Sequence, residues 1–231
     1  MTTTRDQFIA NVRRGLGRGP VDATTRRELE ARLAGHQRNL VPARGQVTGR
    51  QKIDDFVRMV EFALATIVRV KTDADVPGAV ADYLKQQNLP AQIRMAPDKR
   101  LDAIPWNNRP LLQIARGKPV PSDEVGLSGA FAGIAETGTL MLVSGPETPS
   151  TLNFLPETHV VVIRTEEIVG GYEDGWARLR EKLGAMPRTV NFITGPSRSG
   201  DIEQTLQLGA HGPRRLHVVL VDDGAAGGER S

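Results

Sequence analysis

The stretch EVGLSGAFAGIAETGTLMLV, residues 124–143, decides how the second half of this 231-residue chain folds. Its two apolar runs, 124–135 and 139–143, leave no room for a helix between them. The turn ETGT separates the runs, so the spacing predicts two strands joined in a β-hairpin. Small residues crowd the first run, and they would let another backbone or a ligand approach it closely.

Outside the hairpin, helix-like and strand-like segments alternate along the chain. Helical spacing of apolar residues predicts three long helices and a short one, over 50–65, 75–88, 166–184 and 98–106. Short apolar runs predict strands over 66–70, 91–96, 111–115, 159–164, 189–194 and 215–221. This alternation is typical of an α/β protein. We expect a Rossmann-like, mainly parallel sheet with the hairpin inserted in it.

The first part of the chain is basic and predicts a helical N-terminal arm. Residues 1–50 carry ten arginines and four acidic residues, a net charge of +6, whereas the other 181 residues sum to −3. Segments 6–16 and 22–40 have helical spacing but too little apolar surface for a core. Such an arm suits an acidic protein surface, and equally a solvated helical face. Its one aromatic residue, Phe8, gives little support to nucleic-acid binding.

These features divide the chain into three parts. We expect a basic helical arm at 1–47, one α/β domain at 48–222 and a flexible tail at 223–231. The arm is expected to dock on a partner protein or in a homodimer, through Phe8, Ile9, Val12 and Leu16.

Composition restricts the chemistry. The chain has no cysteine, which excludes disulfides, thiolate nucleophiles and cysteine-ligated iron–sulfur clusters within it. Its four histidines form no metal-type cluster with nearby carboxylates, so neither a metal site nor another cofactor is expected. No apolar run approaches the roughly 20 residues that span a bilayer, and the start lacks the apolar core of a signal peptide. The expected location is the cytoplasm.

A loop rich in glycine and serine, GPSRSGD at 195–201, follows an apolar strand and precedes a helix-like segment. Such a loop directs backbone N–H groups at one point, which suits an anion. Its arginine adds a guanidinium that binds carboxylate or phosphate through two hydrogen bonds. The candidate ligand-binding residues here are Gly195, Ser197, Arg198, Ser199 and Asp201. The alternative is an ordinary strand-to-helix turn with Asp201 as the cap.

Two further residues are candidates for acid–base catalysis. His211 lies in the sharp turn GAHGP before the last strand, and histidine titrates near neutral pH. Glu136 ends the strand 124–135, and sites in open α/β sheets lie beyond the carboxyl ends of the strands. We expect both side chains to close one polar pocket beside the 195–201 loop. The adjoining ligand-binding candidates are Thr137, Gly138 and Thr139. The alternatives are a turn histidine bonded to backbone and an exposed hairpin turn.

These segments resemble the lactate utilization protein C family, also called the LUD domain. The resemblance is specific in ETGT, GPSRSGDIE and GAHGP, which occur in the family's order, and it covers roughly residues 50–221. It implies a fold like that of sugar-phosphate isomerases and CoA transferases. It also implies a role in oxidising L-lactate to pyruvate, together with two partner proteins that carry the iron–sulfur chemistry.

Two classes of function therefore remain open. The chain is a non-redox subunit of a lactate-oxidising assembly that binds a small organic or phosphorylated anion, or it is a free-standing enzyme of the isomerase or transferase type. The second class would act on a phosphorylated or acyl substrate. Because one fold hosts many chemistries, the fold alone does not decide between them.

Overall fold

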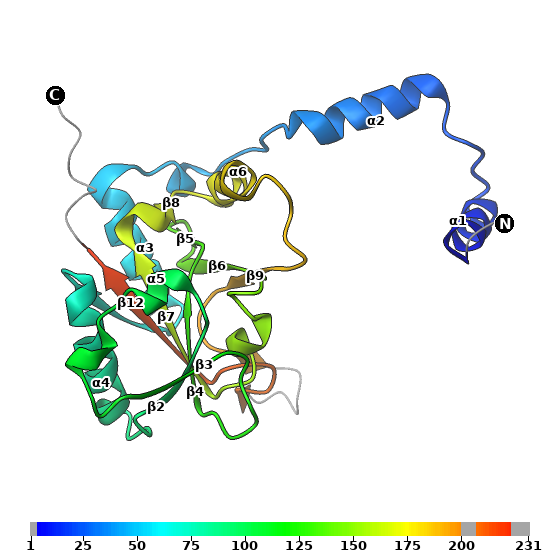
Figure 1. Ribbon diagram of the computed structural model, residues 1–231. Helices are drawn as coiled ribbons and strands as arrows, with labels where there is room; N and C mark the ends of the chain where they lie inside the picture. Colours follow the sequence, from blue (N-terminus) through cyan, green and yellow to red (C-terminus); the bar gives the residue numbers. More distant parts are fainter. Residues whose placement is uncertain (1–3, 200–206, 223–231) are drawn as a thin grey trace. The chain divides into compact units, whose positions relative to one another are not determined.

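The computed structural model describes residues 4–199 and 207–222 of the chain (Figure 1). The predicted tail 223–231 and the candidate Asp201 lie outside the described residues. Contacts divide the chain into two compact units, Met1–Leu40 and Val41–Ser231. The last residues of the expected arm, 41–47, thus fall in the second unit.

The first unit consists of two exposed helices, α1 (Thr4–Gly15) and α2 (Ala23–Gly35). Asp22 caps α2, because its carboxylate accepts hydrogen bonds from the N–H groups of Thr24 and Thr25, each at 2.9 Å. Neither helix buries a side chain, and the arm stays exposed at Phe8, Val12 and Leu16. Within the described part of this unit, these apolar side chains form no core.

A six-stranded sheet forms the centre of the second unit. Its order is β1-β12-β7-β4-β2-β3, and its strand pairs are parallel. The strands are β1 (Thr66–Val70), β2 (Gln92–Met95), β3 (Gln113–Arg116), β4 (Val125–Gly129), β7 (Thr158–Arg164) and β12 (Arg215–Val221). The predicted α/β class with a mainly parallel sheet is confirmed.

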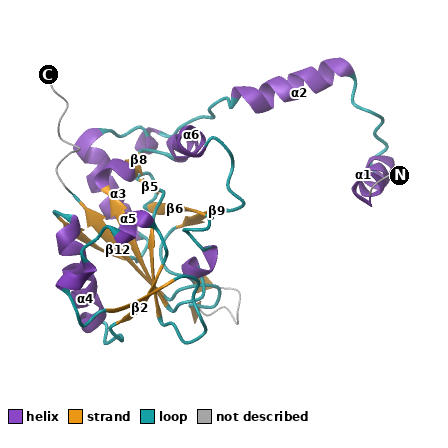
Figure 2. Ribbon diagram, viewed as in Figure 1, coloured by secondary structure: helices purple, strands orange, loops and turns teal. Residues whose placement is uncertain are grey.

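Both faces of this sheet are buried, which explains its continuous apolar strands. Val160 and Val162 of β7 pack in one cluster with α4 (Val76–Gln86), whereas Val161 and Ile163 pack in another with α3 (Gly49–Phe62). This alternation is the two-residue period of a strand. Figure 2 shows the strands at the centre of this unit, with helices beside them. The short predicted helix is α5 (Lys99–Asp102).

The predicted hairpin belongs to a second, four-stranded sheet with the order β8-β5-β6-β9. Its strands are β5 (Ala132–Ile134), β6 (Thr139–Val143), β8 (Ile168–Val169) and β9 (Val190–Ile193). Strands β5 and β6 pair antiparallel around ETGT, as predicted. The single strand predicted over 124–135 is wrong, because the chain leaves the first sheet after Gly129 and enters the second at Ala132. A further antiparallel pair joins β10 (Arg198–Ser199) and β11 (Gln207–Leu208).

The helix predicted over 166–184 begins later, as α6 (Tyr172–Leu183). Gly171 is its N-cap, and at the preceding Gly170 the backbone of Gly45 passes so close that a Cβ would overlap its carbonyl oxygen. The helix ends at Gly184, which has a left-handed φ of 65°. Short 3₁₀ turns complete the unit: η1 (Ala43–Gly45), η2 (Asp73–Asp75), η3 (Trp106–Asn108), η4 (Ser150–Asn153) and η5 (Thr165–Glu167).

Candidate functional site

The two sequence motifs meet at the end of helix α3. Gly138, in the ETGT turn, and Gly195, at the start of the GPSR loop, have left-handed φ angles of 65° and 75°. A Cβ on Gly138 would overlap the backbone of Met59 and Val60, and one on Gly195 would overlap the carbonyl oxygen of Ala63. Only glycine suits both the dihedral angles and the close approach. These two candidates therefore seat their loops against α3.

Four hydroxyl groups join the same two loops. The Oγ1 atoms of Thr137 and Thr139 lie 2.7 Å apart, and each lies 3.0 Å from the hydroxyl of Tyr172. Thr139 Oγ1 also lies 2.6 Å from Thr194 Oγ1. Because Thr139 is fully buried, these bonds satisfy a hydroxyl that water does not reach. The ETGT turn is thus tied to the residue that precedes Gly195.

A cavity of about 270 Å³ opens beside the GPSR loop. Its described polar lining is Asn153, His159, Thr194, Ser197, Arg198 and His211. Its apolar walls include Phe154, Phe192, Ile193 and Leu216. Since Phe154 precedes β7 and Pro213 precedes β12, the cavity lies at the amino ends of these parallel strands. The loops that precede β7 and β12 lead into the large sheet, whereas the GPSR loop follows β9 of the second sheet. The cavity therefore does not lie at the carboxyl ends of the large sheet, where the site was expected.

Arg198 supplies the positive charge of the cavity. No carboxylate lines the cavity among the residues that the structure describes. The Arg198 side chain is exposed, and among the described residues its Nη2 donates a long hydrogen bond, 3.4 Å, to the carbonyl oxygen of Ala63. A ligand can reach this guanidinium from solvent, so the described lining favours an anion.

Ser197 fastens the two loops of the cavity to each other. Its N–H donates to the carbonyl of Pro213 at 2.8 Å, and its carbonyl accepts from the N–H of Gly209 at 2.9 Å. Its Oγ accepts from the N–H of His211 at 3.2 Å. His211 is held through its backbone in this way, and its exposed side chain lines the cavity. Ser199, in contrast, is buried in β10.

Glu136 does not line this cavity. Its carboxylate is buried and forms an ion pair with Arg44, with 3.1 Å between Oε1 and Nη2. Two glycines make room for it, since a Cβ on Gly45 or Gly171 would lie 3.0 or 3.3 Å from Oε2. Gly171 caps the amino end of α6, where the helix dipole favours a carboxylate. The structure therefore does not bring Glu136 and His211 together, and Glu136 is not an exposed turn residue either.

His159 lines the cavity and was missed in the sequence. It is fully buried on β7, where its Nε2 lies 2.8 Å from Ser128 Oγ and shares a hydrogen bond with it. Its Nδ1 has no hydrogen-bond partner among the described residues. Burial lowers the pKa of His159 to about 4, so the ring is neutral at pH 7. The available signal was a histidine inside the otherwise apolar run HVVVI.

Comparison with known proteins identifies the family of these motifs. The LUD domain family matches residues 53–221, which include every described residue of the cavity. The chain belongs to the LUD domain family. A crystal structure of a DUF162 family protein from Deinococcus radiodurans has a similar fold, with a TM-score of 0.58 and 24% identity. The similarity covers 76% of this chain and 99% of that one.

Curated relatives of this LUD domain match over shorter segments. An uncharacterized protein of Neisseria meningitidis is 41% identical over 98 residues, 42% of each chain. Lactate utilization protein C of Geobacillus thermodenitrificans is 35% identical over 102 residues, 43% of this chain and 42% of the relative. The Bacillus subtilis protein of that name is 31% identical over 109 residues, 46% and 45% of the two chains. The chain spans less than half the length of these curated relatives.

At the carboxyl ends of the large sheet of the LUD domain, where a site was expected, charged side chains pair with one another. Arg100 pairs with Asp98 at 2.8 Å and with Glu167 at 2.5 Å. Its Nη1 also donates to the carbonyl of Ala130 at 3.3 Å. Both carboxylates are buried, and burial raises the pKa of Glu167 above its usual value. The guanidinium of Arg100 thus donates its hydrogen bonds to groups of the protein itself, which favours a structural role for this cluster.

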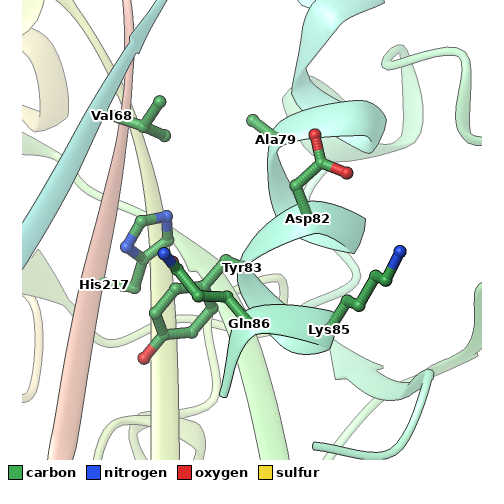
Figure 3. A pocket seen from close by; sticks show the side chains of 7 residues that line it. All are labelled: Val68, Ala79, Asp82, Tyr83, Lys85, Gln86 and His217. Carbon is green, nitrogen blue, oxygen red and sulfur yellow. The ribbon is translucent and has the colours of Figure 1, made fainter. Parts of the chain in front are cut away.

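A second depression of the LUD domain, about 500 Å³, lies between α4 and the edge of the large sheet (Figure 3). Figure 3 shows the ring of His217 beside that of Tyr83, and the two stack with centroids 3.8 Å apart. His217 Nδ1 lies 2.8 Å from Thr66 Oγ1, and burial lowers the pKa of His217 to about 4. The described lining of this depression contains none of the motif residues, so the candidate site is the first cavity.

The described residues contain no group of three or more His, Cys, Asp or Glu side chains that could hold a metal ion. Of the helices within 4–199 and 207–222, none combines the length and the apolar character that a bilayer crossing requires.

Proposed function

We propose that this chain acts in L-lactate utilization, the oxidation of L-lactate to pyruvate, as a subunit that binds a small organic anion. Iron–sulfur partner proteins carry the electrons. The relatives called lactate utilization protein C and the membership of the LUD domain family support this role. One observation carries the anion-binding part: the cavity at the GPSR loop has a guanidinium and, among its described lining residues, no carboxylate.

The lining of the cavity suits a short carboxylic acid. Arg198 can hold a carboxylate through two parallel N–H···O hydrogen bonds. Ser197 Oγ accepts one bond from backbone, and the same hydroxyl can donate its O–H to a ligand. Phe192 and Leu216 offer apolar contact to a short alkyl chain. The cavity, about 270 Å³, lies just below the roughly 300–1,000 Å³ of pockets for larger ligands, which favours a small molecule.

His211 is the residue to which we assign acid–base work. Oxidation of a 2-hydroxy acid to a 2-oxo acid releases two electrons and two protons, so a nearby base is useful. His211 lines the cavity with an exposed side chain, whereas Glu136 is paired with Arg44. The electrons leave this chain, because it offers no cysteine to ligate an iron–sulfur cluster.

The arm is the surface that we propose for docking on the partner proteins. It is basic, and Phe8, Val12 and Leu16 are exposed on it. Buried apolar anchors set the lifetime of a complex, and charges at the rim set its rate of formation. A chain that begins at Val41 keeps Arg44 beside Glu136 and should stay folded. It should fail to restore growth on L-lactate in cells that lack this protein; full growth would refute the docking role.

Calorimetry tests the anion site directly. Arg198→Ala should weaken the binding of L-lactate or pyruvate by about 1.5–3 kcal/mol, the usual contribution of a hydrogen bond to a charged group. Arg188→Ala is the matched control, because Arg188 is exposed and does not line the cavity. Equal affinity in wild type and Arg198→Ala would refute the proposed anion site. Turnover of a sugar phosphate or acyl substrate by the purified chain alone would instead establish the isomerase or transferase alternative.

A further inference from the structure

His159, which lines the same cavity, carries a buried polar atom without a hydrogen-bond partner among the described residues. His159 is 0% exposed, yet its Nδ1 has no hydrogen-bond partner among the described residues. Buried polar groups are nearly always paired, and an exception calls for an explanation such as an absent ligand. The other ring nitrogen is already bonded to Ser128, which does not line this cavity. Nδ1 is thus the ring nitrogen of His159 that can form a hydrogen bond to a ligand.

The protonation state of His159 fits a neutral ligand atom. Burial lowers the pKa of the ring to about 4, so it carries no charge at pH 7. A neutral imidazole has one donor and one acceptor nitrogen. The hydroxyl of Ser128 can take either role toward Nε2, so Nδ1 can donate to a ligand oxygen or accept from a ligand hydroxyl.

We propose that His159 Nδ1 forms the second polar contact of the cavity, a hydrogen bond to the oxygen on carbon 2 of a 2-hydroxy or 2-oxo carboxylic acid. The carboxylate of this acid binds Arg198. The inference rests on the proposed function, because it assumes that the cavity binds a small carboxylic acid. It adds a residue that discriminates between acids of equal charge and similar size.

The distribution of polarity favours this class of ligand. Arg198 and His211 are exposed and present a guanidinium and an imidazole at the solvent side of the cavity, whereas His159 is buried in its wall and neutral. A short acid with a neutral oxygen next to its carboxylate matches that order. A hydrogen bond in a dry site has no competition from solvent, so its loss is felt in affinity.

Two substitutions distinguish the contributions of the two ring nitrogens of His159. In His159→Gln the side-chain amide reaches the position of Nε2 and keeps a partner for Ser128, but nothing replaces Nδ1. In His159→Asn the shorter amide lies near the position of Nδ1 and loses Ser128. Both variants keep a polar amide side chain, and glutamine is also close to histidine in volume, so their comparison tests the contact to the ligand.

Calorimetry with L-lactate, pyruvate and propionate tests the proposal. The three acids share a three-carbon chain and a carboxylate, and propionate lacks the oxygen on carbon 2. Wild type should bind lactate or pyruvate about threefold to tenfold more tightly than propionate, as one net hydrogen bond predicts. His159→Gln should lose this preference while it binds propionate as wild type does. His159→Asn should keep part of it.

The possible failures are distinguishable. If wild type binds none of the three acids, the proposed anion site itself falls. If wild type binds all three equally, or if His159→Gln keeps the preference, Arg198 still holds the anion and the role of His159 is refuted. If His159→Gln does not fold, ¹⁵N NMR of the wild-type ring decides. Lactate or pyruvate should shift the Nδ1 resonance and propionate should not, and an unchanged Nδ1 resonance overturns the proposal.

Discussion

The hydroxyl oxygens of Thr139 and Thr194 lie 2.6 Å apart, although 55 positions separate the two residues in the chain. This contact joins the turn of the β5–β6 hairpin to the residue that precedes the GPSR loop. Thr139 is fully buried, and Tyr172 closes the cluster at 3.0 Å. The hydroxyls of the ETGT turn thus hold one motif against the other, and a direct role in ligand binding stays a prediction for Thr137 and Thr139.

Replacing Thr139 with valine should therefore destabilise the LUD domain. Thr139→Val keeps the shape of the side chain but removes a buried hydroxyl with three neighbours. The expected loss is about 1–3 kcal/mol of unfolding free energy, since Thr194 and Tyr172 lose a partner. Urea denaturation of Thr139→Val, Tyr172→Phe and the double variant measures the coupling. Strictly additive effects would show that the cluster does not act as a unit.

A second prediction concerns the glycine at the start of the GPSR loop. Gly195 and Gly184 both have left-handed φ angles, 75° and 65°, but only Gly195 faces a backbone atom, the carbonyl oxygen of Ala63. Gly184→Ala should cost about 1–2 kcal/mol from the dihedral angle alone, because a Cβ there meets nothing within 4 Å. Gly195→Ala should cost clearly more, above about 3 kcal/mol, because α3 has to move. Equal losses in urea denaturation would contradict the close packing of this loop on α3.

The strands of the large sheet were predictable, whereas the change of sheet was not. Runs such as HVVVIR in β7 are apolar throughout because both of their faces are buried, so they stand out in the sequence. The break after Gly129 left no such signal, since β4 and β5 are equally apolar and buried. The two strands are separated by the strands with which they pair, since β4 pairs with β7 and β5 pairs with β6. The local spacing of apolar residues does not predict which strands pair.

The candidate site was predictable where it consists of loop residues. Arg198 and His211 were found because charged and titratable residues among glycines and prolines suggest a ligand, and both line the cavity. Glu136 was misplaced because its partner, Arg44, comes from a segment that looked like part of the arm. His159 was missed because a single histidine in an apolar strand is most simply explained as part of the core. That its Nδ1 lacks a partner among the described residues can be seen only in the folded structure.

The ion pair between Glu136 and Arg44 gives a third prediction. Glu136→Gln should lower stability by about 1–3 kcal/mol, because the buried side chain loses a charged acceptor at the start of α6. Its coupling to Arg44→Ala should stay below about 1 kcal/mol, since the Arg44 side chain is 70% exposed. A double-mutant cycle by urea denaturation measures both values. Ligand affinity should not change, and a large loss of affinity at full stability would return Glu136 to the binding site.

Two buried histidines make the stability of the fold depend on pH. Burial lowers the pKa of His159 and His217 to about 4, from an ordinary value of 6.5. Between these values the unfolded chain takes up protons that the folded chain does not, so unfolding becomes easier as pH falls from about 6.5 to 4. Above 6.5 both states are neutral at these rings and the effect is absent. Each histidine should cost about 1.4 kcal/mol per pH unit within that window, or roughly 2 kcal/mol at pH 5.

Replacing His217 with phenylalanine isolates one of these contributions. Phenylalanine can keep the stack on Tyr83, and the hydroxyl of Thr66 retains a second acceptor, the carbonyl of Leu216 at 3.4 Å. Between pH 7.5 and pH 5, wild type should lose about 2 kcal/mol more of unfolding free energy than His217→Phe. Urea denaturation at the two pH values gives this difference directly, and carboxylates cancel because both proteins share them. An equal loss in the two proteins would mean that His217 takes up its proton in the folded state, and that burial does not lower its pKa to about 4.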